Sequence, residues 1–170
     1  MTFNAPRTWT DGEFVTATLL NTHVRDNMNA LKAPPSGDYV LNEDADYAGD
    51  ASGWKDVDSV NLSLTLVTTG GDVMVHFSGT FYTTVGTVRV YLDVEVDEEG
   101  ARTAGNDGII GCAVVTTGTP ITFTRLITDL EPGLHEFDLQ WNAQNVHRLA
   151  AGAGTANLDV HPQFWAREVS

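Results

Sequence analysis

Residues 88–96 read VRVYLDVEV, in which an apolar side chain returns at every second position. The same period of two recurs in 62–66, 73–81 and 137–141. Successive side chains of a β-strand point to opposite faces, so this period predicts strands with one apolar and one polar face. Turn sequences separate the runs at 69–72, 97–100, 105–108 and 131–133. Residues 36–170 are therefore predicted to be all-β and to form an antiparallel β-sandwich.

Residues 16–32 carry a helical period instead. Thr16 can cap the first turn, and Pro34-Pro35 ends the helix. Five residues, four of them apolar, are spaced alternately three and four positions apart: Ala17, Leu20, Val24, Asn27 and Leu31. This spacing is typical of a coiled-coil seam, where a single Asn selects register and oligomeric state. The helix is thus expected to self-associate, although a helix that packs on its own chain would show a similar pattern.

The net charge of −14 divides unevenly along the 170 residues. Residues 1–35 hold three basic and three acidic side chains, so the whole excess of acid lies in residues 36–170. We therefore expect two parts, an N-terminal attachment segment over 1–35 and a β-sandwich head over 36–170. Such a charge repels phosphate backbones and anionic lipids, so neither a nucleic acid nor a membrane is an expected partner.

The N-terminal region shows no secretory leader, and no apolar run approaches the roughly 20 residues that span a bilayer. The chain is therefore expected to be made in a cytoplasm and to be soluble there. Trp9 and Phe14 flank an Asp11-Gly12 turn. Two aromatic side chains on so short a segment are expected to anchor a partner, or else to pack locally as a staple.

Two stretches resemble known families. Residues 4–35, NAPRTWTDGEFVTATLLNTHVRDNMNALKAPP, are similar to the N-terminal segment of virion structural proteins of tailed bacteriophages, of the tail, fibre or decoration type. Residues 133–141, GLHEFDLQW, and 164–169, FWAREV, resemble the jelly-roll heads of the complement and tumour-necrosis-factor superfamily. The resemblance implies an all-β head, a complement/TNF-like jelly roll, preceded by a short N-terminal α-helix.

The same resemblance implies a homotrimer, with the helices meeting along the seam and Asn27 facing the three-fold axis. The expected function is that of a bacteriophage virion structural protein, a surface-exposed trimeric knob on a fibre, tail or capsid. Its N-terminal segment would bind other virion proteins through Trp9 and Phe14, and its final location would be the virion.

An alternative function is a host-receptor or carbohydrate-binding adhesin module that recognises a host-surface glycan. Its candidate ligand residues are polar and lie in or near one loop: Asn142, Gln144, Asn145, His147 and Arg148. A third alternative is a non-viral bacterial surface or filament protein.

No metal or cofactor is expected. The five histidines include no pair at the i, i+3 or i, i+4 spacing that zinc sites use. Residues 42–50, NEDADYAGD, superficially resemble a calcium loop, but Lys55 stands where an EF-hand needs a bidentate Glu. The one alternative for a structural calcium ion is a looser site, made of carboxylates from two loops or two subunits.

No enzyme is expected either. Asp93 and Glu95 alternate on the solvent face predicted for one strand, so neither is expected to have the raised pKa of a general acid. The chain also lacks the Gly-x-Ser-x-Gly, His-Glu-x-x-His and phosphate-loop motifs. Cys112 lies in the apolar run 109–115 and is expected to pack in the core.

Overall fold

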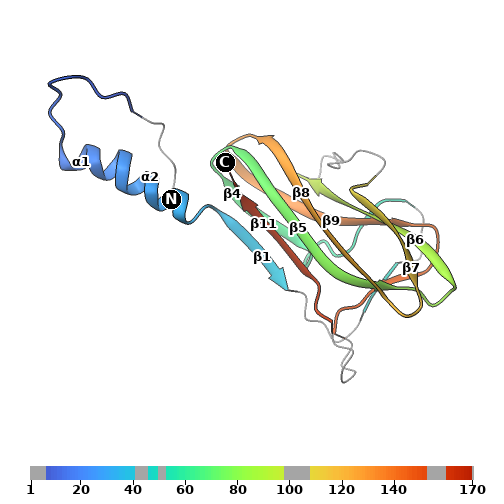
Figure 1. Ribbon diagram of the computed structural model, residues 1–170. Helices are drawn as coiled ribbons and strands as arrows, with labels where there is room; N and C mark the ends of the chain where they lie inside the picture. Colours follow the sequence, from blue (N-terminus) through green and yellow to red (C-terminus); the bar gives the residue numbers. More distant parts are fainter. Residues whose placement is uncertain (1–6, 41–45, 50–52, 98–107, 153–159, 170) are drawn as a thin grey trace.

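The computed structural model describes residues 7–40, 46–49, 53–97, 108–152 and 160–169. Their strands form two antiparallel sheets that pack face to face (Figure 1). The first sheet, sheet A, contains β1 (Ser36–Val40), β2 (Tyr47–Gly49), β5 (Gly71–Tyr82), β8 (Thr119–Leu130), β10 (His147–Leu149) and β11 (Gln163–Glu168). The second, sheet B, contains β3 (Lys55–Asp56), β4 (Ser63–Thr68), β6 (Thr87–Val96), β7 (Ile110–Val115) and β9 (Gly133–Ala143).

The long strands follow a jelly-roll order. In sheet A, β1, β11, β5 and β8 lie side by side, and β10 shares an edge of β5 with β11. In sheet B, β4, β9, β6 and β7 lie side by side, with β3 beyond the end of β4 on the same edge of β9. The chain crosses between the sheets from β4 to β5, β5 to β6, β7 to β8 and β8 to β9. The predicted antiparallel β-sandwich is therefore confirmed.

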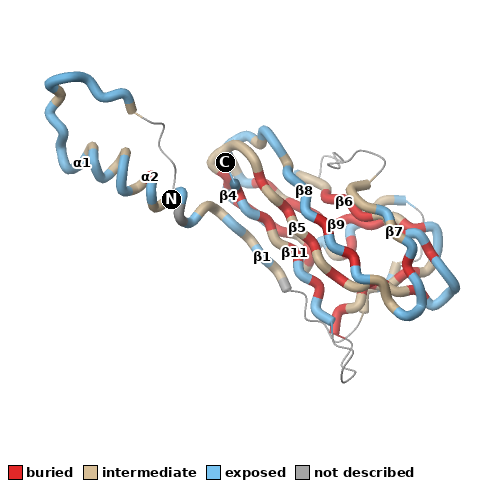
Figure 2. The backbone as a smooth tube through the Cα atoms, viewed as in Figure 1, coloured by how far each residue is buried: buried red, intermediate tan, exposed pale blue. Residues whose placement is uncertain are grey.

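Period-two alternation decides which side chains fill the core. In β9, Phe137, Leu139 and Trp141 point inward and are buried, and β5 contributes Phe77 and Phe81 in the same way. Figure 2 shows this alternation as red and paler segments along the strands. Cys112 lies at intermediate exposure and packs against the core, where burial raises the pKa of its thiol.

The helical segment lies beyond one end of the sandwich (Figure 1). It consists of α1 (Ala17–Leu20), a π-helical turn (Asn21–Arg25) and α2 (Asp26–Lys32). The hydroxyl of Thr16 accepts a hydrogen bond from the Leu19 amide at 3.2 Å, as expected of an N-cap. The predicted helix is present, but the sequence pattern did not predict its π-turn.

Candidate functional site

The helical segment exposes one apolar side. Four apolar side chains on it are exposed: Leu20, Val24, Met28 and Leu31. Asn27, which was expected to face a three-fold axis, is only 8% exposed in the single chain. The π-turn adds a residue to one helical turn and so shifts the phase of everything after it. In the single chain, Met28 therefore lies on the exposed side where the spacing had placed Asn27, and the seam itself stays a prediction.

The two N-terminal aromatic residues have different surroundings. The Arg7 guanidinium lies 5.1 Å from the centre of the Trp9 ring, and that ring contacts His23 edge-on at 6.5 Å. Arg7 also pairs with Glu13. Phe14, in contrast, is 88% exposed. Trp9 therefore has local packing contacts but is still 40% exposed, and the ring of Phe14 is more exposed; attachment through these two residues stays a prediction.

The candidate ligand residues of the 142–148 region do not form one site. His147 is 1% exposed and packs edge-on against Trp141, with ring centres 4.4 Å apart. The side chain of Asn142 accepts a hydrogen bond from the Gly53 amide at 3.0 Å. His147 is therefore corrected from a ligand residue to a core residue, because its ring faces into the sandwich. Gln144 and Asn145 are exposed, and Arg148 is partly buried.

The outer face of sheet B carries a concentration of carboxylates. Strand pairing places Glu95 beside Asp138, and places both Asp93 and Asp56 beside Gln140. The Gln140 amide nitrogen donates to Glu95 Oε2 at 2.5 Å and to Asp56 Oδ1 at 2.9 Å. The sequence showed the acids of 93–99, but residues 56 and 138 join them only through strand register.

Burial in this acidic face perturbs one carboxyl group. Asp138 is 5% exposed. This burial, together with the nearby charges of Glu136, Asp56 and Glu95, raises the pKa of Asp138 to about 6, and Ser63 opposes the rise by hydrogen bonding. The expectation of a simple solvent face is therefore wrong for this strand pair, since Asp93 is buried as well.

The described residues also bear on metal binding and on membrane insertion. Among them, no three His, Cys, Asp or Glu side chains are grouped so that they could hold a metal ion. Most of the calcium-like stretch 42–50 lies outside the described residues. No helix in the described ranges is long and apolar enough to cross a membrane.

A buried glutamate ties the linker to the head. The Glu168 amide donates to the carbonyl of Pro35 at 3.0 Å. Its carboxylate accepts from the amide of Thr69 at 2.8 Å and from the hydroxyl of Thr69 at 2.9 Å. A groove of about 520 Å³ lies beside this junction, lined by Pro35, Thr68 and Pro132 among others. The end of the head nearest the helix is thus held by polar contacts.

We expect Glu168→Ala to lower the free energy of unfolding by about 1–3 kcal/mol, because both Thr69 donors would lose their acceptor. Urea denaturation followed by tryptophan fluorescence measures this change. Glu131→Ala is the matched control, since Glu131 is exposed and contributes its backbone carbonyl to the contacts of this region. A loss in the control equal to that in Glu168→Ala would contradict the assignment.

Together, the strand order and the appended helix define a jelly-roll β-sandwich carried on a short N-terminal helical segment. No protein-family model matches the chain, and no curated protein matches it. Among solved structures, Eiger TNF from S. frugiperda matches 81% of this chain and 95% of its own, at 10% identity and a TM-score of 0.45.

Two viral proteins are also similar. The VP2 subviral particle of infectious bursal disease virus matches 80% of this chain and 38% of its own, at 11% identity and a TM-score of 0.39. A pentameric capsid protein isolated from metagenomic phage sequences matches 96% of this chain and 80% of its own, at 15% identity and a TM-score of 0.29. At such values these likenesses carry no functional argument, and the jelly-roll assignment rests on the strand order itself.

Proposed function

We propose that the chain is a bacteriophage virion structural protein, a trimeric surface knob attached through residues 1–35. The observation that carries this proposal is the exposed apolar side of the helix, displayed beyond one end of the sandwich (Figure 2). The phage-like sequence of residues 4–35 supports the assignment to a virion.

Self-association would bury the apolar side of the helix. A fully buried Leu, Val or Met side chain contributes about 1.5–3 kcal/mol relative to an exposed one. An isolated helix of this length is marginal in water, so packing against other helices would also stabilise the helix itself. Leu20, Val24, Met28 and Leu31 would form the contact between three copies.

Charge favours the proposed orientation. The attachment segment is electrically balanced, and the head carries the whole net charge of −14. Heads of like charge repel one another at low salt, so contacts on the helices are expected to dominate the assembly.

Sedimentation of the full-length chain tests the trimer. We expect a trimeric mass for the wild type and a monomeric mass for the double variant Leu20→Asp, Val24→Asp. The variant replaces two of the four exposed apolar side chains of the helix by charged ones. The control double variant Thr18→Asp, Asn21→Asp adds the same charge at exposed polar positions and should remain trimeric. A monomeric wild type, or an assembled Leu20/Val24 variant, would rule out this contact.

Purified particles test the location. We expect the wild-type chain at a fixed copy number divisible by three, with density for the head outside the shell or tail in a cryo-EM map. The Leu20/Val24 variant should be depleted from the particles. A wild-type chain absent from particles would overturn the virion assignment even if the trimer forms in solution.

A further inference from the structure

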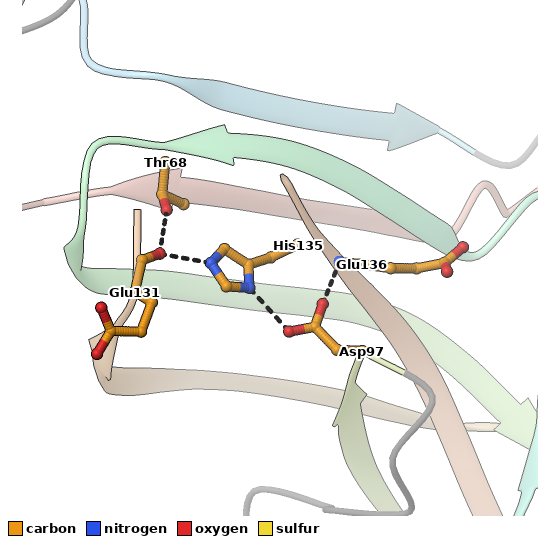
Figure 3. A network of polar contacts seen from close by, with 5 residues as sticks. All are labelled: Thr68, Asp97, Glu131, His135 and Glu136. Carbon is orange, nitrogen blue, oxygen red and sulfur yellow. Dashed lines mark hydrogen bonds and ion pairs between the residues drawn. The ribbon is translucent and has the colours of Figure 1, made fainter. Parts of the chain in front are cut away.

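At the end of the head near the linker, both ring nitrogens of one histidine face hydrogen-bond acceptors (Figure 3). His135 lies near the start of β9, and its ring is buried. Its Nδ1 is 2.8 Å from Oδ2 of Asp97, which follows β6 directly. Its Nε2 is 2.7 Å from the carbonyl oxygen of Glu131, in the turn between β8 and β9. The imidazole therefore bridges two parts of the chain.

The chemistry of these partners determines the protonation state that they favour. A carbonyl oxygen only accepts hydrogen bonds, and an ionised carboxylate does the same. A neutral imidazole has a single N–H and can satisfy only one of them. Its other nitrogen would then present a lone pair to an acceptor, which is repulsive. Only the doubly protonated ring of His135 donates to Asp97 and Glu131 together.

The partners of His135 are themselves held in place. The backbone of Asp97 has a φ of 60°, uncommon outside glycine, and its Oδ1 accepts from the Glu136 amide at 2.9 Å. The carbonyl of Glu131 also accepts from the Thr68 hydroxyl at 3.2 Å. The ring thus connects the end of β6, the end of β4 and the turn between β8 and β9.

The same turn contacts the turn between β4 and β5. Gly70 has a φ of 97°, and a Cβ built on it would lie 2.8 Å from Cγ of Pro132. Movement of residues 131–133 would therefore disturb Gly70 and its neighbour Thr69, which Glu168 holds next to the linker. A change in the contacts of His135 can therefore affect the junction with the helix through Pro132, Gly70 and Thr69.

The titratable groups around the ring are acidic. Asp97 comes from the end of β6, Glu131 from the turn and Glu136 from β9 itself. On the other side of β9, the neighbouring strand β4 presents Leu66 and Thr68, and Glu168 of sheet A binds the following residue, Thr69. Of these groups, Asp97 contacts the ring, and its charge favours the imidazolium form. Burial opposes the charged ring, but the hydrogen bonds to Glu131 and Asp97 and the charge of Asp97 outweigh it and raise the pKa of His135.

We propose that His135 is a proton-operated clamp, closed when the ring is doubly protonated and weakened when one proton leaves. The closed clamp fastens the turn between β8 and β9 to Asp97. Loss of a proton replaces one of its two hydrogen bonds by a lone-pair contact, so the turn loosens from the end of β6. This device lies within a single head and does not depend on the proposed trimer.

The direction of the effect follows from linkage. A histidine whose pKa is higher in the folded state stabilises that state fully below its unfolded value, 6.5 for an ordinary histidine. That stabilisation is lost as the pH rises through the folded pKa. The clamp therefore holds in mild acid and weakens toward alkaline pH.

The first test is an NMR titration of the histidine ring protons in the full-length chain. We expect the His135 midpoint to lie above 6.5 and to fall in Asp97→Asn, which keeps the shape of the side chain but removes its charge. A wild-type midpoint at or below 6.5, or one that Asp97→Asn leaves unchanged, would overturn the clamp.

The second test compares urea midpoints at pH 5.5 and 8.5. The fall in midpoint toward pH 8.5 should become shallower in His135→Gln. His76→Gln is the control: burial lowers the pKa of His76, so its removal takes away an opposing contribution and should not flatten the dependence. An unchanged pH dependence in His135→Gln, or a flattening equal to it in His76→Gln, would overturn the proposal. Asp97→Asn keeps the test decisive if His135→Gln does not fold.

Discussion

Replacing Phe77 by alanine is expected to lower the free energy of unfolding by about 3–5 kcal/mol. The Phe77 ring is fully buried between the sheets. It packs against Phe81 and Phe123, with ring centres 6.0 and 5.8 Å away. The substitution removes apolar contacts and leaves a cavity that Phe81, on the same strand, and Phe123, on the paired strand β8, are poorly placed to fill. Urea denaturation at constant pH, followed by circular dichroism, measures the change.

Leu126→Ala is the control for this experiment. Leu126 lies on β8, which pairs with the same strand as Phe77, but its side chain is exposed on the outer side. Its replacement should change the free energy of unfolding by no more than about 0.5 kcal/mol. A loss for Phe77→Ala as small as that of the control would contradict the placement of Phe77 in the core.

Asp138→Asn is expected to stabilise the protein by about 1–3 kcal/mol near neutral pH. The pKa of Asp138 is raised to about 6 from its usual 3.8, so the ionised group opposes folding above that pH. Below pH 3.8 the group is protonated in both the folded and the unfolded state, so it brings no penalty; the penalty grows between pH 3.8 and about 6 and is complete above that range. Asparagine keeps the size of the side chain and an acceptor for Ser63, and it removes the charge.

The pH dependence distinguishes this local effect from a general effect of net charge. The gain for Asp138→Asn should be full near pH 7.5 and should nearly vanish near pH 4, in urea denaturation at both values. Asp38→Asn changes the net charge equally but lies exposed on β1 in the other sheet. A gain in the Asp38 variant equal to that of Asp138→Asn would contradict the local account.

The raised pKa values of His135 and Asp138 change the stability of the fold with pH in the same direction. Both groups lie on β9, and each stabilises the folded state more when it is protonated. Sheet B is therefore expected to be more stable in mild acid than at alkaline pH. The two contributions are separable, because His135→Gln removes one and Asp138→Asn removes the other.

The strands and the helix could be predicted from short-range pattern alone. Alternation in 88–96 and 137–141 identifies the inward-facing apolar positions, because the two-residue period of a strand is local geometry. It does not predict that the outward-facing Asp93 and Asp138 are buried as well. Thr16 and Pro34-Pro35 mark the limits of the helix for equally local reasons. The π-turn, in contrast, could not be predicted, because residue types alone do not determine this change in backbone hydrogen bonding. It shifts the helix so that Asn27 lies off the exposed side.

The candidate sites were harder to predict, because they depend on partners that are distant in the chain. His147 follows an exposed polar loop and was expected to bind ligand, but packing against Trp141 places it in the core. Glu168 and Thr69 meet across 99 positions of sequence, and no local pattern of either residue points to the other.

The amino-acid sequence by itself determined an acidic, all-β head, a neutral helical segment and the boundary region between them, since composition and periodicity are properties of contiguous residues. Only the tertiary structure decided which acids meet on sheet B and that His135 faces two acceptors. Strand register and turn geometry bring those groups together, and they are set by the packing of the whole sandwich. The pH response proposed for the head therefore follows from its folded arrangement, although every group that takes part is visible in the sequence.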